Sequence, residues 1–230
     1  MLHPLYRDRL HAGKRLAECL AAYQGTNSLV LGIPRGGVPV AAEIARRLYL
    51  DLDVVVVRKL GAPMQPELAL GAVTAGGWHY LNESLIAESG VTPEELERMM
   101  GVEMAAARQR EARYRHGRPI QAAWGRTAII VDDGLATGAT MRAAICAVRV
   151  QRPLRLVVAA PVAARETCDE LRAETGVVDE IVCPHELDRF VAVGLHYEDF
   201  DATSDAEVCR LLDEAVARPR CAPSAPPASS

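Results

Sequence analysis

Two adjacent carboxylates, Asp132 and Asp133, come shortly before a loop of small residues that carries two hydroxyl groups. The apolar run 127–131 ahead of them is rich in β-branched residues, which predicts a strand buried on both faces. After them, residues 136–140 (ATGAT) offer successive backbone N–H groups at the positive end of a helix predicted over 141–150, which suits one phosphate monoester. An acid beside a phosphate repels it, so we expect the aspartates to accept hydrogen bonds from vicinal hydroxyls or to help hold a metal ion. Ribose with a 5-phosphate fits both halves of this segment.

Residues 131–140 (VDDGLATGAT) resemble the ribose-phosphate signature of type I phosphoribosyltransferases, in which two acids and a short spacer precede a Thr-Gly-x-Thr loop. A Walker A loop would need a lysine after its last glycine, and a dinucleotide-binding loop would need G-x-G-x-x-G; this segment has neither. The alternative interpretation is an ordinary strand-to-helix turn with two capping acids. The resemblance implies that ribose 5-phosphate contacts Asp132, Asp133, Ala136, Thr137, Gly138, Ala139 and Thr140.

A second loop, residues 34–37 (PRGG), follows an apolar strand predicted over 28–33 and precedes a helix. Arg35 supplies a forked cation for phosphate oxygens, and Gly36 and Gly37 can present amides without side-chain hindrance. Taken alone the pattern is weak, because an ordinary turn could have the same residues. Ahead of a ribose-phosphate segment it resembles the pyrophosphate-binding loop of the same family, in which a strained or cis peptide occurs.

A third segment, residues 53–58, predicts a buried strand, and Arg58 and Lys59 stand at its end. Two cations at a strand end commonly just face solvent. In a parallel sheet covered by helices, however, ligands bind at the carboxyl ends of the strands, so all three segments would face one crevice. The resemblance adds a mobile catalytic loop after this strand. Residues 60–67, punctuated by Gly and Pro, are the lid candidate, and Glu67 is a candidate general base.

The 230 residues, of which 50% are hydrophobic, can bury one substantial core. The expected fold is α/β: a type I phosphoribosyltransferase-like parallel-sheet core with helices on both faces, plus a small C-terminal hood. Its expected parts are an N-terminal helical segment (1–27), the core (28–183), the hood with a C-terminal helix (184–216) and a disordered tail (217–230). Helices are expected over 8–23, 38–48, 92–115, 141–150 and 164–175, and strands over 28–33, 53–58, 69–75, 127–131, 155–161 and 178–183. The arginines of the helix over 92–115 are expected to form mostly a solvated face.

The predicted hood contains both phenylalanines of the chain within residues 188–200. Residues 193–197 (VGLHY) are similar to a base-binding segment of purine-salvage members, although His196 replaces the acid found there. The resemblance makes Val193, His196 and Tyr197 candidates for contacting a base. The alternative is that these aromatic residues form core beneath a loop.

Charge and cysteine usage narrow the classes of partner. The net charge of −4 argues against bulk nucleic-acid binding. The six cysteines have no metal-binding spacing, which favours reduced thiols, and residues 183–185 (CPH) are expected to be structural. Because neither a signal peptide nor a long apolar span is evident, we expect a cytoplasmic protein without a membrane partner. We also expect a homodimer.

The resemblance implies an enzyme of nucleotide salvage that uses 5-phosphoribosyl 1-diphosphate (PRPP) with Mg²⁺ to phosphoribosylate a nitrogen base, purine rather than pyrimidine, and releases pyrophosphate. Mg²⁺ would be held mainly through PRPP, with Asp132 and Asp133 as candidate ligands. Catalysis is assigned to Arg58, Lys59, Asp132 and Asp133, and pyrophosphate binding to Arg35, Gly36 and Gly37. The alternative is a non-catalytic regulator that senses PRPP. A repressor of that kind would need a DNA-binding module, and no separate helix-turn-helix is evident before Leu29.

Overall fold

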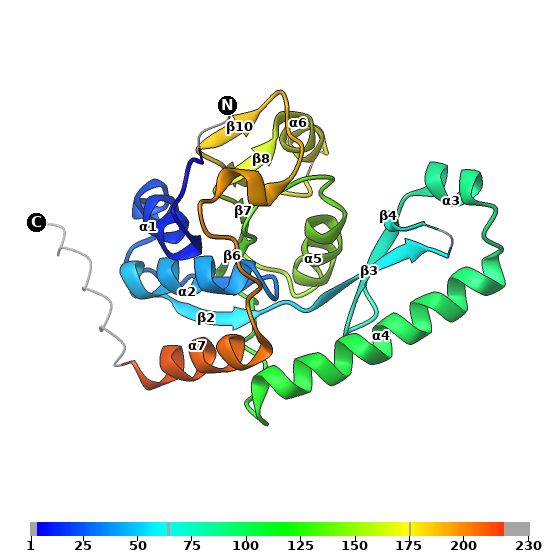
Figure 1. The fold of residues 1–230 in the computed structure, drawn as a ribbon. Coiled ribbons are helices and arrows are strands. Elements are labelled where there is room, and N and C mark those ends of the chain that lie inside the picture. The colour runs from blue at the N-terminus through cyan, green and yellow to red at the C-terminus, as the bar shows by residue number, and fades with distance from the viewer. Residues whose placement is uncertain (1–3, 64, 175, 219–230) are drawn as a thin grey trace, which may run out of the picture.

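The computed structural model describes residues 4–63, 65–174 and 176–218 (Figure 1). The predicted tail beyond residue 218 and the side chain of Glu67 lie outside the described part. The core is a five-stranded sheet in the order β2-β1-β6-β7-β9, with all neighbours parallel. Its strands are β1 (Leu29–Gly32), β2 (Asp51–Val54), β6 (Thr127–Val131), β7 (Arg155–Ala159) and β9 (Glu180–Val182).

Helices cover both faces of this sheet, as predicted. One face packs against α1 (Arg9–Cys19), α2 (Gly37–Leu48) and α7 (Asp205–Ala217); the other packs against α5 (Ala139–Arg149) and α6 (Arg165–Ala173). Successive residues of each strand enter the two cores in turn, because side chains alternate across a strand. In β6, Ile129 belongs to the first core and Ile130 to the second.

An arm of antiparallel strands and two helices leaves the core after β2, at the right of Figure 1. It consists of β3 (Val57–Ala62), β4 (Gln65–Thr74), β5 (His79–Leu81), α3 (Glu83–Ser89) and α4 (Pro93–Arg115). The strand predicted over 69–75 is present as part of β4, but it and the second part of the predicted strand over 53–58 lie in the arm and not in the parallel core sheet. The valine run ends β2 at Val54, crosses out of the core sheet and begins β3 at Val57, and apolar periodicity cannot mark where such a run changes sheets.

The predicted lid is part of this arm. Residues 60–62 end β3, and residues 65–67 begin the backbone of β4, so the described part of the stretch 60–67 belongs to a hairpin instead of an irregular loop. Gly61 lies at the register shifts of the β3–β4 pairing between Leu60 and Ala62. Closure of this hairpin over a ligand stays a prediction.

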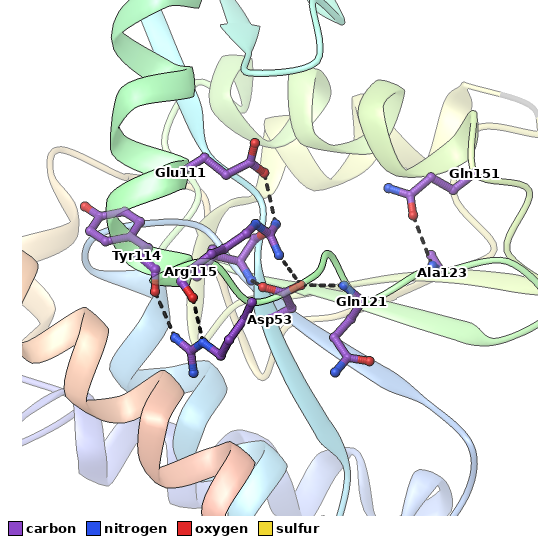
Figure 2. A network of polar contacts seen from close by, with 9 residues as sticks. Asp53, Glu111, Tyr114, Arg115, Gln121, Ala123 and Gln151 are labelled. Atoms are coloured by element: carbon purple, nitrogen blue, oxygen red, sulfur yellow. Dashed lines mark hydrogen bonds and ion pairs between the residues drawn. The ribbon is translucent and has the colours of Figure 1, made fainter.

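A buried ion-pair network fixes the arm to the core. The Thr92 capping box starts α4 as predicted. At the other end of α4, Arg115 Nη1 donates to Asp53 Oδ2 at 2.5 Å and Arg115 Nη2 donates to Glu111 Oε1 at 2.9 Å (Figure 2). The backbone N–H of Gln121 also donates to Asp53 Oδ2, at 2.8 Å. Arg115 is a buried exception to the expectation that the arginines of α4 form mostly a solvated face, since Arg98, Arg108 and Arg113 are exposed.

The hood lies beyond the carboxyl edge of the core sheet, at the top of Figure 1. It includes β10 (His185–Leu187), which pairs in parallel with β8 (Val162–Ala164) of the predicted core, and the short 3₁₀ helix η2 (Val193–His196). The N-terminal segment joins it: Leu5 and Tyr6 N–H groups donate to the His196 carbonyl at 2.9 and 3.0 Å. A second 3₁₀ helix, η1 (Ala21–Tyr23), follows α1. The division of the chain into the four predicted parts stays a prediction.

Two expectations from the sequence concern membrane spans and cysteine chemistry, and the residues that the structure describes bear on both. Within that part of the chain, no helix combines the length and apolar character needed to cross a membrane. The five cysteines that the structure describes are free thiols. Cys183 Sγ lies 3.4 Å from the His185 carbonyl oxygen.

Candidate active site

The site lies where the strand order of the core sheet reverses direction. Strand β1 has β2 on one side and β6 on the other, so the chain leaves β1 and β6 at neighbouring positions on the carboxyl edge. The ends pair directly, with Gly32 opposite Val131, and Ile33 N–H donates to the Val131 carbonyl at 2.9 Å. Ligands of open α/β sheets bind at such switch points. Both predicted loops, 34–37 and 132–140, start here.

Glycines let these two loops touch. A Cβ atom at Gly36 would overlap Asp133 Oδ2, and one at Gly37 would lie 2.5 Å from the Val131 carbonyl oxygen. Any side chain at either position would therefore push the loops apart. The peptide between Pro34 and Arg35 is cis, the feature that the family resemblance associates with this loop. The loop then enters α2 at Gly37.

The loop 136–140 ends at the N-terminus of α5. Gly138 has φ 72°, in the left-handed region that favours glycine, and a Cβ there would lie 2.8 Å from Thr167 Cγ2. Thr167 Oγ1 donates to the Ala136 carbonyl at 2.5 Å, so helix α6 supports the loop from behind. This loop, the two aspartates, Pro34, Lys59 and Val193 all line one cleft of about 260 Å³.

The two aspartates have different surroundings. Asp133 Oδ2 accepts from Arg9 Nε at 2.8 Å, and the Asp133 N–H donates to Asp132 Oδ1 at 2.9 Å. Burial, together with the neighbouring charge of Asp133, raises the pKa of Asp132 well above its usual value, while the Lys59 charge opposes this shift. The pair therefore combines one carboxylate held by a cation with one that binds a proton more readily.

The side chains of the two predicted cations, Arg58 and Lys59, point in different directions from β3. Consecutive residues of a strand face opposite sides, so β3 directs only one of them into the cleft. That residue is Lys59. Arg58 Nε instead lies 2.7 Å from Glu103 Oε2 on α4, inside the arm. Arg35 is exposed and is not among the residues that line the cleft.

Comparison with known proteins agrees with this geometry. The family model described as the phosphoribosyl transferase domain matches residues 7–198, well over half of the chain. The chain belongs to this family. The family predicted from the two loops is thereby confirmed, and so is its α/β fold.

Three relatives extend the comparison. The structure of TT1426 from Thermus thermophilus superposes with a TM-score of 0.75 at 45% identity, covering 91% of this chain and 98% of that chain. Two proteins of Mycobacterium tuberculosis, Rv0571c of strain H37Rv and MT0597 of strain CDC 1551, are provisionally named phosphoribosyl transferases. Each is 42% identical over 212 residues, which are 92% of this chain and 47% of the relative. The chain thus spans about half the length of the curated relatives it matches.

The hood of this phosphoribosyl transferase family member contributes Val193 to the cleft, and a Cβ at Gly134 would lie 2.6 Å from Val193 Cγ1. Tyr197 is only 5% exposed; its ring packs between Tyr6 and Phe200, with centroids 5.5 and 5.0 Å away. The Tyr197 hydroxyl donates to the Asp133 carbonyl at 2.6 Å. This geometry favours the core interpretation of Tyr197 and does not support its ring as a stacking surface for a base.

His196 is buried as well, and its Nε2 atom has no hydrogen-bond partner among the described residues. Its ring packs against Phe190, with centroids 5.3 Å apart. Burial and the nearby charge of His185 lower the pKa of His196 below its ordinary value of 6.5. In the folded protein this side chain therefore resists protonation, which suits a core residue.

The free energy of unfolding should accordingly fall as the pH drops below about 6.5, because His196 then binds a proton in the unfolded chain but not in the folded protein. The contribution is fully present above about pH 6.5 and is lost as the pH falls toward the lowered folded-state pKa, at up to about 1.4 kcal/mol per pH unit. Urea unfolding at about pH 7.5 and about pH 5.5, on either side of the ordinary histidine pKa, measures the loss, which should be smaller in His196→Leu. Parallel pH dependences of the two proteins would contradict this assignment.

The described carboxylates fit a metal ion that arrives with its substrate. Within residues 4–63, 65–174 and 176–218, no group of three or more His, Cys, Asp or Glu side chains could hold a metal ion. Mg²⁺ commonly binds through one or two carboxylates and otherwise through substrate oxygens and water. Asp132 and Asp133 could supply these one or two carboxylates.

Sequence reasoning missed two residues of the site. Arg9 is the first residue of α1, and it reaches Asp133 across 124 positions of the chain. Thr167 supports the loop 136–140 from α6. No local pattern marks either one, because each contact depends on how distant elements pack.

Proposed function

We propose that the protein binds PRPP with Mg²⁺ in this cleft and transfers its phosphoribosyl group to a nitrogen base, releasing pyrophosphate. The observation that carries the proposal is the joining of two aspartates, a threonine loop and a lysine in one cleft at the switch point of the sheet. Membership of the phosphoribosyl transferase family supports it.

The two ends of the ligand would meet two helix N-termini. Helix α5 begins at Ala139 after the threonine loop, and α2 begins at Gly37 after the PRGG loop. The positive ends of helix dipoles and their free N–H groups favour phosphate. We assign the 5-phosphate to the loop before α5 and the pyrophosphate to the loop before α2. The ribose would then span the two aspartates between them.

This arrangement suits the charge that develops in the reaction. Cleavage of the bond from C1 to pyrophosphate builds positive charge on the ribose and negative charge on the leaving group. Lys59 would stabilise the leaving group, and Arg35 would do so from the PRGG loop. When bound, Mg²⁺ supplies further positive charge to the pyrophosphate oxygens. Holding the sugar at Asp132 and Asp133 orients C1 toward the incoming nitrogen.

The accepting base is proposed to be a purine, approaching between Val193 and the ribose. The finer assignments stay predictions that rest on the sequence and on the family resemblance. They are a cytoplasmic location, a role in nucleotide salvage, a homodimer, and the absence of nucleic-acid and membrane partners. Sedimentation of the purified protein checks the dimer.

Removing the Lys59 side chain should separate the roles of the two ends of the ligand. Lys59→Ala is expected to weaken PRPP binding or turnover by at least about tenfold, because a charge-assisted hydrogen bond contributes about 1.5 to 3 kcal/mol and about 1.4 kcal/mol corresponds to tenfold. Ribose 5-phosphate has no pyrophosphate, so its affinity should stay nearly unchanged. Calorimetric titration of both ligands with Mg²⁺ measures the difference.

The matched control is Lys14→Ala, because Lys14 on α1 is the only other lysine of the chain and does not line the cleft. This variant should bind both ligands like the parent. Equal losses for PRPP and ribose 5-phosphate in Lys59→Ala would instead mean that Lys59 supports the arm in general. Absence of PRPP binding by the parent protein would overturn the proposed function.

A further inference from the structure

Arg9 makes three contacts, one of them with Asp133 of the candidate ribose site. Its Nε donates to Asp133 Oδ2 at 2.8 Å, and its Nη1 donates to the Asp201 carbonyl at 2.7 Å. The guanidinium carbon lies 3.9 Å from the centre of the Phe200 ring. Hydrogen bonds on two sides and an aromatic face beneath hold the guanidinium in one orientation.

Segments from the two ends of the described chain carry this arginine to the site. The Glu198 N–H donates to the Tyr6 carbonyl at 2.8 Å, and the Asp199 N–H donates to the Arg7 carbonyl at 2.7 Å. The Asp8 side chain caps α1 by accepting from His11 N–H, so Arg9 occupies the first position of a fixed helix. The guanidinium therefore has a rigid support.

The ion pair is largely removed from water. The side chains of Arg9 and Asp133 are 12% and 13% exposed. Loss of one partner from such a pair leaves the other charge poorly solvated, which differs from loss of a surface pair. The Asp133 carbonyl is also held, by the Tyr197 hydroxyl at 2.6 Å. The backbone of Asp133 is thus fixed from the hood, and its side chain is fixed from α1.

We propose that Arg9 is a positioning residue that fixes the Asp133 carboxylate for hydrogen bonding to the ribose hydroxyls; this inference rests on the proposed function. Arg9 uses one of the roughly four acceptor positions of the carboxylate, which leaves others for a ligand. Asp132 has no such cation as a hydrogen-bond partner among the described residues, and its Oδ1 accepts from the Asp133 N–H at 2.9 Å. Arg9 would therefore control one acid of the pair.

The experiment compares affinities for ribose 5-phosphate and for inorganic pyrophosphate by calorimetry. Arg9→Ala should weaken ribose 5-phosphate binding by about tenfold and leave pyrophosphate binding nearly unchanged, because the ribose hydroxyls, and not the pyrophosphate, would hydrogen-bond to the Asp133 carboxylate. The matched control is Arg15→Ala, which removes an exposed ion pair with Glu18 from the same helix and should change neither affinity. If Arg9→Ala does not fold, Arg9→Lys keeps the charge without the fork and should show a smaller selective loss.

A double-variant cycle tests whether Arg9 acts through Asp133. If it does, the combination of Arg9→Ala with Asp133→Asn should bind ribose 5-phosphate no more weakly than Asp133→Asn alone. Additive losses, or an equal loss of pyrophosphate affinity, would overturn the positioning role. A parent protein that binds no ribose 5-phosphate would reject the proposed function and this inference with it. A parent that binds normally and an unaffected Arg9→Ala would reject the inference alone.

Discussion

Replacing both Asp132 and Asp133 with asparagine is expected to weaken ribose 5-phosphate binding by at least about a hundredfold. Each charge-assisted hydrogen bond contributes about 1.5 to 3 kcal/mol, and about 1.4 kcal/mol corresponds to one decade in affinity. Both side chains line the cleft that would hold the sugar. Calorimetry with ribose 5-phosphate measures the loss directly.

The Asp132→Asn variant alone adds a second expectation. Because the pKa of Asp132 is raised in the folded protein, its charge at neutral pH opposes folding. Removal of that charge should increase the melting temperature while it decreases ligand affinity. This combination is typical of a residue kept for function at a cost in stability. Asp169→Asn, at an exposed position on α6, is the control and should alter neither quantity. An unchanged ribose 5-phosphate affinity in the double variant would show that the acids do not serve the ligand.

Arg115→Ala is expected to destabilise the protein by about 3 to 5 kcal/mol, the cost of leaving one member of a buried ion pair alone. The variant would leave Asp53 in the core without its cation, and α4 would lose its ion pair to the end of β2, while Glu111 of the same helix would lose its partner (Figure 2). Guanidinium unfolding followed by circular dichroism measures the change.

A surface pair on the same helix provides the comparison. Arg113 is 65% exposed and pairs with Asp205, so Arg113→Ala should cost less than about 1 kcal/mol. If Arg115→Ala also lowers the free energy of unfolding by less than about 1 kcal/mol, the network in Figure 2 contributes little to holding the arm.

The core and its two loops could be predicted because their signals are local. Strands β1 and β6 are apolar runs that end in loops, and the glycines of the PRGG loop stand where a side chain would collide with the other loop. The arm could not be predicted in this way. A continuous run of valines satisfies a parallel core strand and a crossing into an antiparallel sheet equally well, so periodicity predicted one strand over 53–58 where the chain has parts of two.

The sequence did not reveal which side chains point into the cleft. Arg58 and Lys59 look equivalent as residues, but the alternation of β3 sends only Lys59 to the cleft. Tyr197 has an aromatic ring that could stack on a base, but this ring packs between Tyr6 and Phe200. Arg9 has no motif at all. Its contact with Asp133 depends on the pairing of the N-terminal segment with residues 198–199, which no local pattern reveals.

Release of pyrophosphate from PRPP in the presence of Mg²⁺ and a panel of purine and pyrimidine bases tests the central claim most directly. We expect release that depends on one base, a purine, and that falls by at least about tenfold in Lys59→Ala, as a loss of at least about 1.4 kcal/mol at the leaving group requires. Tight PRPP binding without base-dependent release in the panel would contradict the proposed transfer and favour a PRPP-sensing regulator.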